Sequence, residues 1–349
     1  MNRIRVLVVE DSKTVRARLV EVISSDPGLE VIGEADNGKT AIEMCDEARP
    51  DVVTMDMMMP VMSGLAATEY IMSHCPTPIL VVSASVNRGE LFKIYEALAA
   101  GAVDVLDKPA GPEAGELWER RLIALIKLVA RIRVIRHPRV RIMPAQTPPP
   151  APGSVPMSLV AIGASTGGPG AVVRILRDLP VQFQLPVLLV QHINEPFGSA
   201  FTEWLDGQTE RRVSEAKDGV DIMSLRGRVV VAPGDRHLVV RRGHIHLTDD
   251  PARHSCRPSV DILFESVAHE YGPSGIACLL TGMGKDGASG LLKVREAGGM
   301  TIAQDEASSV VYGMPREAAM IGAARQILAL DEIGRRLVAL QSVGQGVRI

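Results

Sequence analysis

The apolar residues of this sequence are grouped in short runs, each followed by polar residues and separated from the next run by a helical pattern. In the first part of the chain the runs are Ile4–Val9, Val31–Ile32, Asp51–Met55, Ile79–Val82 and Val103–Leu106. Near-continuous apolar strands that alternate with helices are typical of a parallel sheet with helices on both faces. Similar runs follow residue 157, so we predict an α/β fold with a mainly parallel, doubly wound sheet in the second half as well.

Composition divides the chain into two domains and a connector. Residues 131–156 hold five arginines and no acidic residue, and seven prolines lie among the 19 residues from Pro138 to Pro156. Such a segment cannot bury a core and is typical of an extended linker. We therefore predict a first domain at residues 1–130, a basic, Pro-rich linker at 131–156 and a second domain at 157–349. The helical spacing of Leu117–Ile135 predicts an amphipathic helix at the end of the first domain.

The sequence has no feature of a membrane or secreted protein. Its longest uninterrupted apolar stretches are five residues, and the amino-terminal residues lack the apolar segment and cleavage site of a signal peptide. The four cysteines, at positions 45, 75, 256 and 278, fit neither the spacing of a zinc knuckle nor a disulfide framework. We expect a cytoplasmic protein without membrane insertion, in which the cysteines are small buried apolar residues.

Polar residues follow four of the runs in the first domain. Glu10 and Asp11 come after the first run, Asp56 after the third, Ser83 after the fourth and Lys108 after the fifth. The carboxyl ends of parallel strands meet at one edge of a sheet, so these groups should converge there. Three carboxylates at close range require a cation, and Mg²⁺ prefers such oxygen ligands. With a lysine and a hydroxyl to hold phosphoryl oxygens, Asp56 is the predicted phosphoryl acceptor.

Residues that flank these positions make the pattern specific: Pro60 and Gly64 behind Asp56, Ala84 after Ser83, and Pro109 after Lys108. Over about residues 3–127 the chain resembles the receiver domain of two-component response regulators. The resemblance implies a (βα)5 flavodoxin-like fold and transient phosphorylation of Asp56 by a chemotaxis histidine kinase.

The same resemblance assigns roles to the polar residues. It implies that Mg²⁺ is bound by Glu10, Asp11, Asp56 and the backbone carbonyl of Met58, and that Ser83 and Lys108 sense the phosphoryl group. Receivers usually carry an aromatic switch residue three positions before the lysine, where this chain has Val105. A switch that depends on an aromatic rotamer is therefore not implied.

A glycine-rich turn follows the first strand-like run of the second domain, Leu159–Ile162. Gly163, Ser165 and Gly167 match G-x-S-x-G, and helical spacing begins just after them, which is the setting of a nucleophile elbow. There the glycines allow a sharp turn, and the helix amino terminus offers N–H groups to an oxyanion. The motif by itself also fits a phosphate-binding turn or a purely structural turn.

Two other strand ends carry the partners that a nucleophilic serine needs. An apolar run at 186–190 is followed by His192, and another at 276–280 opens into a glycine-rich loop that contains Asp286. His192 is the predicted base, and Asp286 is the acid that would orient its imidazole. The same loop's glycines would bring the Met283 backbone N–H towards the oxyanion. His237 has no comparable motif, and we expect it to be solvated or to cap a helix.

Six collinear segments resemble the chemotaxis protein-glutamate methylesterase (CheB) family over about residues 158–345: Gly163–Pro169, Val190–His192, Ala232–Leu238, Arg257–Asp261, Thr281–Gly287 and Tyr312–Pro315. The chain order Ser, His, Asp differs from that of the α/β-hydrolases, in which the histidine comes last. The resemblance implies hydrolysis of glutamate γ-methyl esters on the cytoplasmic domains of methyl-accepting chemoreceptors, with release of methanol. It also implies deamidation of receptor glutamines, a role in chemotaxis adaptation, and no cofactor for the esterase chemistry.

Carried over by position, the family's roles fall on the residues already singled out. Ser165 is the nucleophile, His192 the general base and then acid, and Asp286 the orienting acid; Thr166 and the Met283 backbone assist at the oxyanion. Two positions depart from the family pattern. Cys256 stands where a histidine often precedes Arg-Pro-Ser, and Val230 stands where a tyrosine is common. We expect that neither touches the triad and that both alter the groove.

A receiver joined to an esterase suggests control by phosphorylation. The acidic first domain is expected to cover the Ser165 cleft at rest, and phosphorylation of Asp56 should shift the population towards an open form. Parts of the sequence are also compatible with two other functions. A transcriptional regulator would use the basic segment at 131–141 on DNA, but residues 157–349 lack a helix-turn-helix pattern, so we expect no nucleic-acid partner. An enzyme of the same fold acting on a different ester or amide, in another chemosensory pathway, stays open.

Overall fold

The computed structural model describes residues 3–84, 88–108, 115–132, 155–193 and 198–342, and the chain divides into two compact units, Met1–Val140 and Arg141–Ile349. Most of the linker expected at 131–156 lies outside the described residues, as does Pro109 of the receiver pattern. Within the ranges given above, no helix is long and apolar enough to cross a membrane.

The first unit is a five-stranded parallel sheet in the order β2-β1-β3-β4-β5. Its elements are β1 (Ile4–Val9), α1 (Lys13–Ser24), β2 (Leu29–Ala35), α2 (Gly38–Ala48), β3 (Val52–Met55), α3 (Gly64–His74), β4 (Ile79–Ser83), α4 (Arg88–Ala100), β5 (Asp104–Asp107) and α5 (Glu116–Val129). β2 is longer than its apolar pair predicts, because it lies at the edge of the sheet and exposes polar residues. α5 ends at Val129, before the predicted end at Ile135.

The second unit is a seven-stranded sheet in the order β14-β13-β12-β6-β7-β9-β8, and all its strand pairs are parallel. Its strands are β6 (Leu159–Ala164), β7 (Val187–Gln191), β8 (Val213–Glu215), β9 (Val229–Val231), β12 (Gly275–Leu279), β13 (Met300–Gln304) and β14 (Gln326–Leu328); β10 (His237–Arg241) and β11 (His244–Thr248) form a separate antiparallel hairpin. The predicted α/β class is confirmed in both units.

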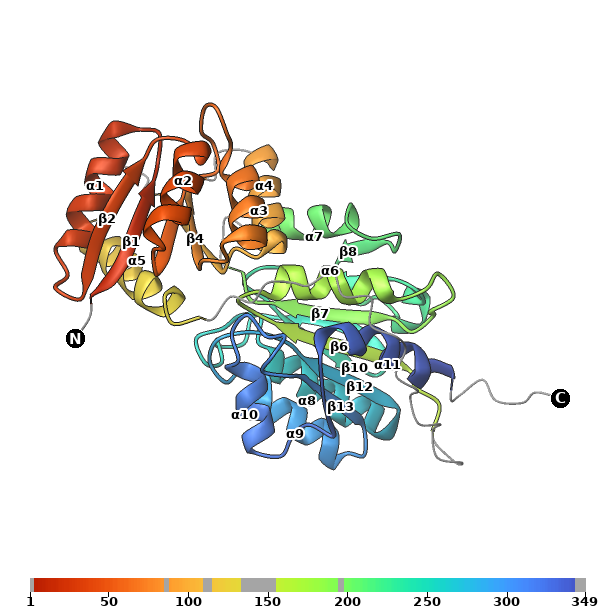
Figure 1. Ribbon diagram of the computed structural model, residues 1–349. Helices are drawn as coiled ribbons and strands as arrows, with labels where there is room; N and C mark the ends of the chain where they lie inside the picture. Colours follow the sequence, from red (N-terminus) through yellow and green to blue (C-terminus); the bar gives the residue numbers. More distant parts are fainter. Residues whose placement is uncertain (1–2, 85–87, 109–114, 133–154, 194–197, 343–349) are drawn as a thin grey trace. The chain divides into compact units, whose positions relative to one another are not determined.

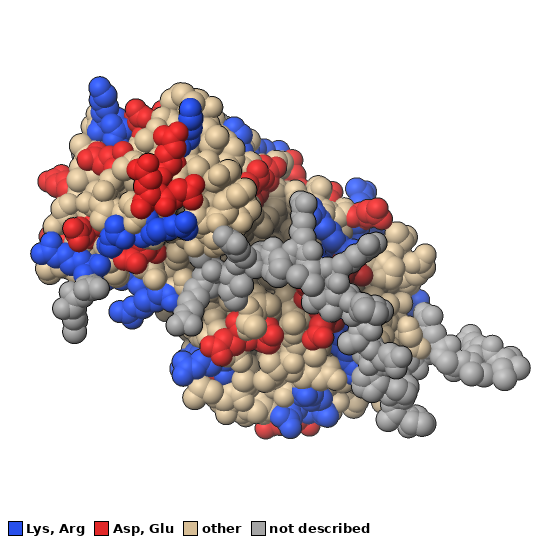
Figure 2. Space-filling model, in the orientation of Figure 1, with Lys and Arg blue, Asp and Glu red and all other residues tan. Residues whose placement is uncertain are grey.

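Helices cover both faces of the second sheet (Figure 1). α6 (Gly168–Asp178) packs with α11 (Leu330–Ser342) on one face, and α8 (Val260–Tyr271), α9 (Ala288–Glu296) and α10 (Met314–Met320) pack together on the other. The remaining helical elements are α7 (Gly198–Asp206), η1 (Ile222–Leu225) and η2 (Gly272–Ser274). Figure 2 shows Lys, Arg, Asp and Glu side chains of the described residues interspersed on the visible face.

The register of the central strands determines which loops are neighbours. Ala164 at the end of β6 pairs with Gln191 at the end of β7, and Gly163 pairs with Leu279 at the end of β12. The strands are fully buried between the helix layers. The loops that follow them therefore open side by side at one edge of the sheet, which is where an open α/β sheet forms its sites.

Candidate active site

Ser165 lies in the tight turn between β6 and α6. Gly167 has a φ of +76°, a left-handed conformation that favours glycine and lets α6 begin at Gly168. The Ser165 N–H donates to the Thr281 carbonyl (3.0 Å), and the Ser165 carbonyl accepts from the Gly168 N–H (2.7 Å) and from Gln191 Nε2 (2.8 Å). These bonds hold the half-buried serine between the loops that follow β7 and β12.

His192 and Asp286, 94 positions apart, meet at this edge of the sheet. The His192 N–H donates to the Ala164 carbonyl (2.9 Å), which continues the β6–β7 ladder by one residue. In the ring, Nε2 lies 2.9 Å from Asp286 Oδ2. The His192 side chain is 14% exposed and that of Asp286 only 2%, so the contact is largely shielded from water. The strand ends therefore bring the predicted base and acid into direct contact.

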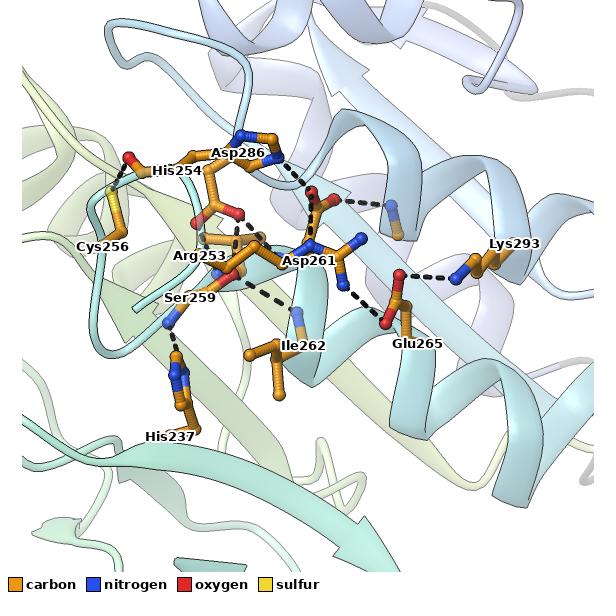
Figure 3. Close-up of polar contacts among 12 residues, drawn as sticks. His237, Arg253, His254, Cys256, Ser259, Asp261, Ile262, Glu265, Asp286 and Lys293 are labelled. Carbon is orange, nitrogen blue, oxygen red and sulfur yellow. Dashed lines mark hydrogen bonds and ion pairs between the residues drawn. The ribbon is translucent and has the colours of Figure 1, made fainter. Parts of the chain in front are cut away.

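The carboxylate of Asp286 sits at the amino terminus of α8 (Figure 3). Oδ1 accepts from Ser259 Oγ (2.7 Å) and from the Asp261 N–H (3.1 Å), while Oδ2 accepts from the Val260 N–H (2.7 Å). The helix dipole also favours a negative charge here. Burial raises the pKa of Asp286, but the hydrogen bonds from His192, Ser259 and Val260 outweigh it and hold the pKa below its usual range. Ser259 is not among the predicted site residues, although a serine just before an apolar helical pattern is a typical N-cap.

Cys256 lies against the triad, so the expectation that it would not touch the triad is wrong. Its Sγ is 3.8 Å from His192 Nδ1. Residues 253–256 form a tight turn in which Arg253 and Cys256 exchange backbone hydrogen bonds of 3.0 and 2.8 Å. Cys256 is also only partly buried, unlike the other three cysteines. Chain spacing gave no indication of this contact, because the turn is positioned by the tertiary fold.

The surroundings of His192 favour its charged form. Burial lowers the pKa of His192, but the hydrogen bonds with Asp286 and Cys256 outweigh burial and raise the pKa to about 9. A carboxylate at one ring nitrogen stabilises the imidazolium that forms when a histidine accepts a proton. His192 therefore binds a proton more tightly in this site than an imidazole does in water.

Ser165 and His192 follow adjacent strands, but no hydrogen bond between Ser165 Oγ and His192 is present among the described residues. Since Nε2 is engaged by Asp286, Nδ1 is the ring nitrogen left to take a serine proton. The imidazole is thus turned the opposite way from that of the Ser-His-Asp proteases, in which Nδ1 faces the aspartate. Hydrogen bonds between nucleophile and base often tighten only when substrate binds.

The loop after β12 passes directly beside Ser165. A Cβ on Gly282 would lie 2.7 Å from Ser165 Cβ, so only glycine fits at this position. Thr281 Oγ1 donates to the Thr166 carbonyl (2.9 Å), which ties this loop to the serine turn. Met283 is the next residue along, and it is 51% exposed. Thr166 and Met283, the two residues expected to assist at the oxyanion, therefore flank the same turn.

A cluster of polar side chains lies around Asp286 (Figure 3). Asp261 is fully buried; it accepts from the Gly290 N–H (2.6 Å), and its Oδ2 lies 3.2 Å from His254 Nε2. Arg253 pairs with Glu265 at 2.8 Å. These contacts fasten the 253–256 turn to α8 and so hold Cys256 beside His192.

Two other expectations about the second unit need correction. His237, expected to be solvated or to cap a helix, is fully buried, and its Nδ1 accepts from the N–H of Ser259, the N-cap residue of α8 (3.1 Å). Val230 lies on β9, is 2% exposed and belongs to the apolar core, so it does not line a groove. Both residues lie in strands of the fold, where neighbouring elements cover them.

The polar residues of the first unit converge as the strand order predicts. Oxygens of Glu10, Asp11 and Asp56 all lie within 4.8 Å of one another. Lys108 Nζ lies 2.8 Å from Glu10 Oε2 and 3.1 Å from Asp56 Oδ2. Burial raises the pKa of both Glu10 and Asp56, and Lys108 offsets this only in part. A set of hard oxygen ligands with excess negative charge fits Mg²⁺.

The remaining receiver positions lie around this group. The Lys108 N–H donates to the Ser83 carbonyl (3.1 Å), so the predicted sensing residues are backbone neighbours on β4 and after β5. Met58 follows Asp56 by two positions, and its Sδ is 3.3 Å from Lys93 Nζ. Val105 pairs with Val81 within the sheet.

Comparison with known proteins covers both units. Residues 160–337 match the family model described as CheB methylesterase, and residues 6–117 match the response regulator receiver domain. A Myxococcus xanthus protein named protein-glutamate methylesterase/protein-glutamine glutaminase 4 is 44% identical, over 96% of each chain. A Nitrosospira multiformis protein with the same name, without the number, is 42% identical over 97% of each chain. The crystal structure of the Thermotoga maritima CheB methylesterase catalytic domain is 37% identical with a TM-score of 0.50, over 53% of this chain and 100% of that one.

Proposed function

This chain belongs to the CheB methylesterase family, and we propose that Ser165, His192 and Asp286 carry its chemistry. It is a protein-glutamate methylesterase/protein-glutamine glutaminase with a receiver domain. The observation that supports this assignment most directly is the 2.9 Å contact between His192 Nε2 and Asp286 Oδ2, beside the Ser165 turn. The substrates are glutamate γ-methyl esters and glutamine side chains on the cytoplasmic domains of methyl-accepting chemoreceptors. The reaction serves chemotaxis adaptation.

The reaction proceeds through an acyl-enzyme. Ser165 Oγ attacks the γ-carbonyl carbon while His192 Nδ1 takes the hydroxyl proton, and Asp286 stabilises the resulting imidazolium. The backbone N–H groups of Thr166 and Met283 stabilise the oxyanion. His192 then returns the proton to the leaving methoxide, and methanol departs. A water molecule, deprotonated by His192, releases the glutamate carboxylate and restores Ser165.

The receiver domain supplies control through Asp56. Glu10, Asp11, Asp56 and the Met58 carbonyl would hold Mg²⁺, which neutralises phosphoryl oxygens during transfer. A chemotaxis histidine kinase is the phosphodonor. Lys108, already paired with Asp56 at 3.1 Å, is suited to contact the phosphoryl group on that carboxylate, with Ser83 beside it.

Ser165→Ala tests the nucleophile. The full chain and the variant are incubated with receptor membranes that carry radiolabelled methyl esters, and volatile methanol is counted. We expect the variant to lose at least about 10³-fold in rate, since loss of a nucleophile removes the covalent route. Its thermal unfolding midpoint should be unchanged, because a hydroxyl in a half-buried turn contributes little to packing.

Ser214→Ala is the matched control, since Ser214 is an exposed serine on β8 of the same unit. It should release methanol at the parent rate. Methanol release by Ser165→Ala at that rate would exclude Ser165 as the nucleophile. Release of label from a different ester but not from receptors would instead assign the triad to another substrate.

A further inference from the structure

A thiol and an imidazole lie next to each other in the site, and the esterase reaction does not need the thiol. Cys256 Sγ is 3.8 Å from His192 Nδ1. Cys256 is partly exposed and the His192 side chain is 14% exposed, so an ion from solution can reach both. Cys45, Cys75 and Cys278 are buried. Cys256 is therefore the accessible thiol of the chain.

The distance between these two atoms suits two ligands of one zinc ion. With Zn–S and Zn–N bonds of about 2.3 and 2.1 Å at a tetrahedral angle, the sulfur and nitrogen lie about 3.6 Å apart. The observed 3.8 Å needs only a small adjustment of the two side chains. A ring nitrogen of His192, the Cys256 sulfur and an Asp286 oxygen also lie within 4.8 Å of one another.

Asp286 supplies the outer support that metal-binding histidines usually have. Such a histidine binds the metal through one nitrogen and donates its other ring N–H to a carboxylate, which fixes the ring. Here Nε2 meets Asp286 Oδ2 at 2.9 Å, which leaves Nδ1 to face the thiol. The Asp286 oxygens already accept from Ser259, Val260 and Asp261, so the carboxylate is held in place as a partner of the ring.

We propose that Cys256 and His192 bind a zinc ion or another thiolate-preferring divalent cation, and that this ion inhibits the esterase. Binding releases two protons: the Cys256 thiol and the protonated His192 ring each lose one to water, and the thiolate sulfur and Nδ1 then bind the ion. Water or Ser165 completes the coordination. The inhibitory half rests on the proposed function, in which Nδ1 accepts the Ser165 proton; an ion on Nδ1 removes that base.

The ligand types separate this site from the receiver's cation site. Mg²⁺ prefers oxygen ligands and binds poorly to thiolate and imidazole, whereas Zn²⁺ prefers them. The magnesium that supports phosphorylation therefore does not inhibit the esterase. A second candidate group, His254 with Asp261 and Asp286, has no sulfur ligand, and its carboxylates accept backbone N–H groups of α8 and α9. We therefore assign the ion to Cys256 and His192.

Cobalt titration tests the binding site without relying on esterase activity. The full chain, freed of transition metals and kept in Mg²⁺, is titrated with Co²⁺. We expect a thiolate-to-cobalt absorption band in the near ultraviolet that saturates at about one equivalent. Cys256→Ala should lose the band, and His269→Ala, which changes an exposed histidine on α8, should keep it. No band in the parent, or a band that survives in Cys256→Ala, would overturn the site.

Methanol release in the presence of Zn²⁺ tests inhibition. Zinc should lower the parent rate at least about tenfold, and a zinc chelator should restore it. In Cys256→Ala, measured against its own zinc-free rate, half-inhibition should need at least about 100-fold more zinc, as expected when a ligand is lost. A parent that binds Co²⁺ but keeps its full rate in Zn²⁺ would refute the inhibition. If the zinc-free parent released methanol no faster than Ser165→Ala, the proposed function would be refuted instead. The cobalt titration would still support the binding site.

Discussion

At the residue scale, the surroundings of His192 decide the pH range in which the site works. A base must be neutral to accept the Ser165 proton, yet Asp286 and Cys256 both favour the charged ring and raise its pKa to about 9. The Asp286 carboxylate favours the protonated ring in the resting enzyme, and it stabilises the imidazolium that forms during the reaction for the same reason. The surroundings that stabilise the transferred proton therefore also favour the protonated, inactive form of the ring near neutral pH.

This balance predicts a rising pH profile. Below the His192 pKa the ring is protonated and inactive, so kcat/KM for methanol release should increase about tenfold per pH unit between about pH 6 and 8 and level off near pH 9. Cys256→Ala should move the rising part of the curve to lower pH, because the cysteine contributes to the raised pKa. Ser165→Ala provides the background hydrolysis at each pH. A curve centred near the ordinary histidine value and unchanged in Cys256→Ala would contradict this account.

At the scale of elements, α8 does two things at its first turn. Ser259 caps the helix, since its hydroxyl accepts from the Ile262 N–H, and the same hydroxyl donates to Asp286. The Val260 and Asp261 N–H groups, which have no partner within the helix, also bind the carboxylate. Asp286 is therefore oriented by a helix end, and Ser259 is a positioning residue that acts through Asp286.

Ser259→Ala should separate these two roles. Loss of the cap should lower the free energy of unfolding by about 1 kcal/mol. Loss of a hydrogen bond to a buried carboxylate, worth about 1.5–3 kcal/mol, should lower kcat by about ten- to a hundredfold, with KM unchanged because Ser259 is buried.

Two variants control for a merely structural effect of this change. Ser259→Thr keeps the hydroxyl and should restore kcat. Ser266→Ala removes a hydroxyl farther along α8, whose partners are the Leu263 carbonyl and the Val240 N–H, and should change stability but not kcat. An equal loss of kcat in Ser259→Ala and Ser266→Ala would show that Ser259 does not act through Asp286.

At the scale of the whole molecule, the order of elements along the chain accounts for most of what could be predicted. Alternating apolar runs and helices require parallel sheets, and parallel sheets gather the residues after each strand at one edge. That reasoning was enough to bring Glu10, Asp56 and Lys108 together, and His192 to Asp286. It could not give the direction of the His192 ring or the contact with Cys256. The ring direction depends on the Asp286 contact, and the thiol contact depends on how Asp261 and Glu265 hold the 253–256 turn; no periodic pattern records either.

We expect the first unit to control the esterase activity of the second through phosphorylation of Asp56. Phosphorylation adds negative charge to a carboxylate that already lies 3.1 Å from Lys108, and the sequence has Val105 where an aromatic switch would be. We therefore expect any signal to pass through Lys108 and Ser83 rather than an aromatic rotamer.

A small phosphodonor with Mg²⁺ should raise methanol release by the full chain. A tenfold rise would correspond to about 1.4 kcal/mol of population shift. In Asp56→Asn the rates with and without phosphodonor should be equal, and removal of Mg²⁺ should have the same effect on the parent. Asp46→Asn, which changes an exposed acid on α2, should keep the stimulation. Stimulation of Asp56→Asn to the parent's level would show that the receiver acts on the esterase by some route other than this carboxylate.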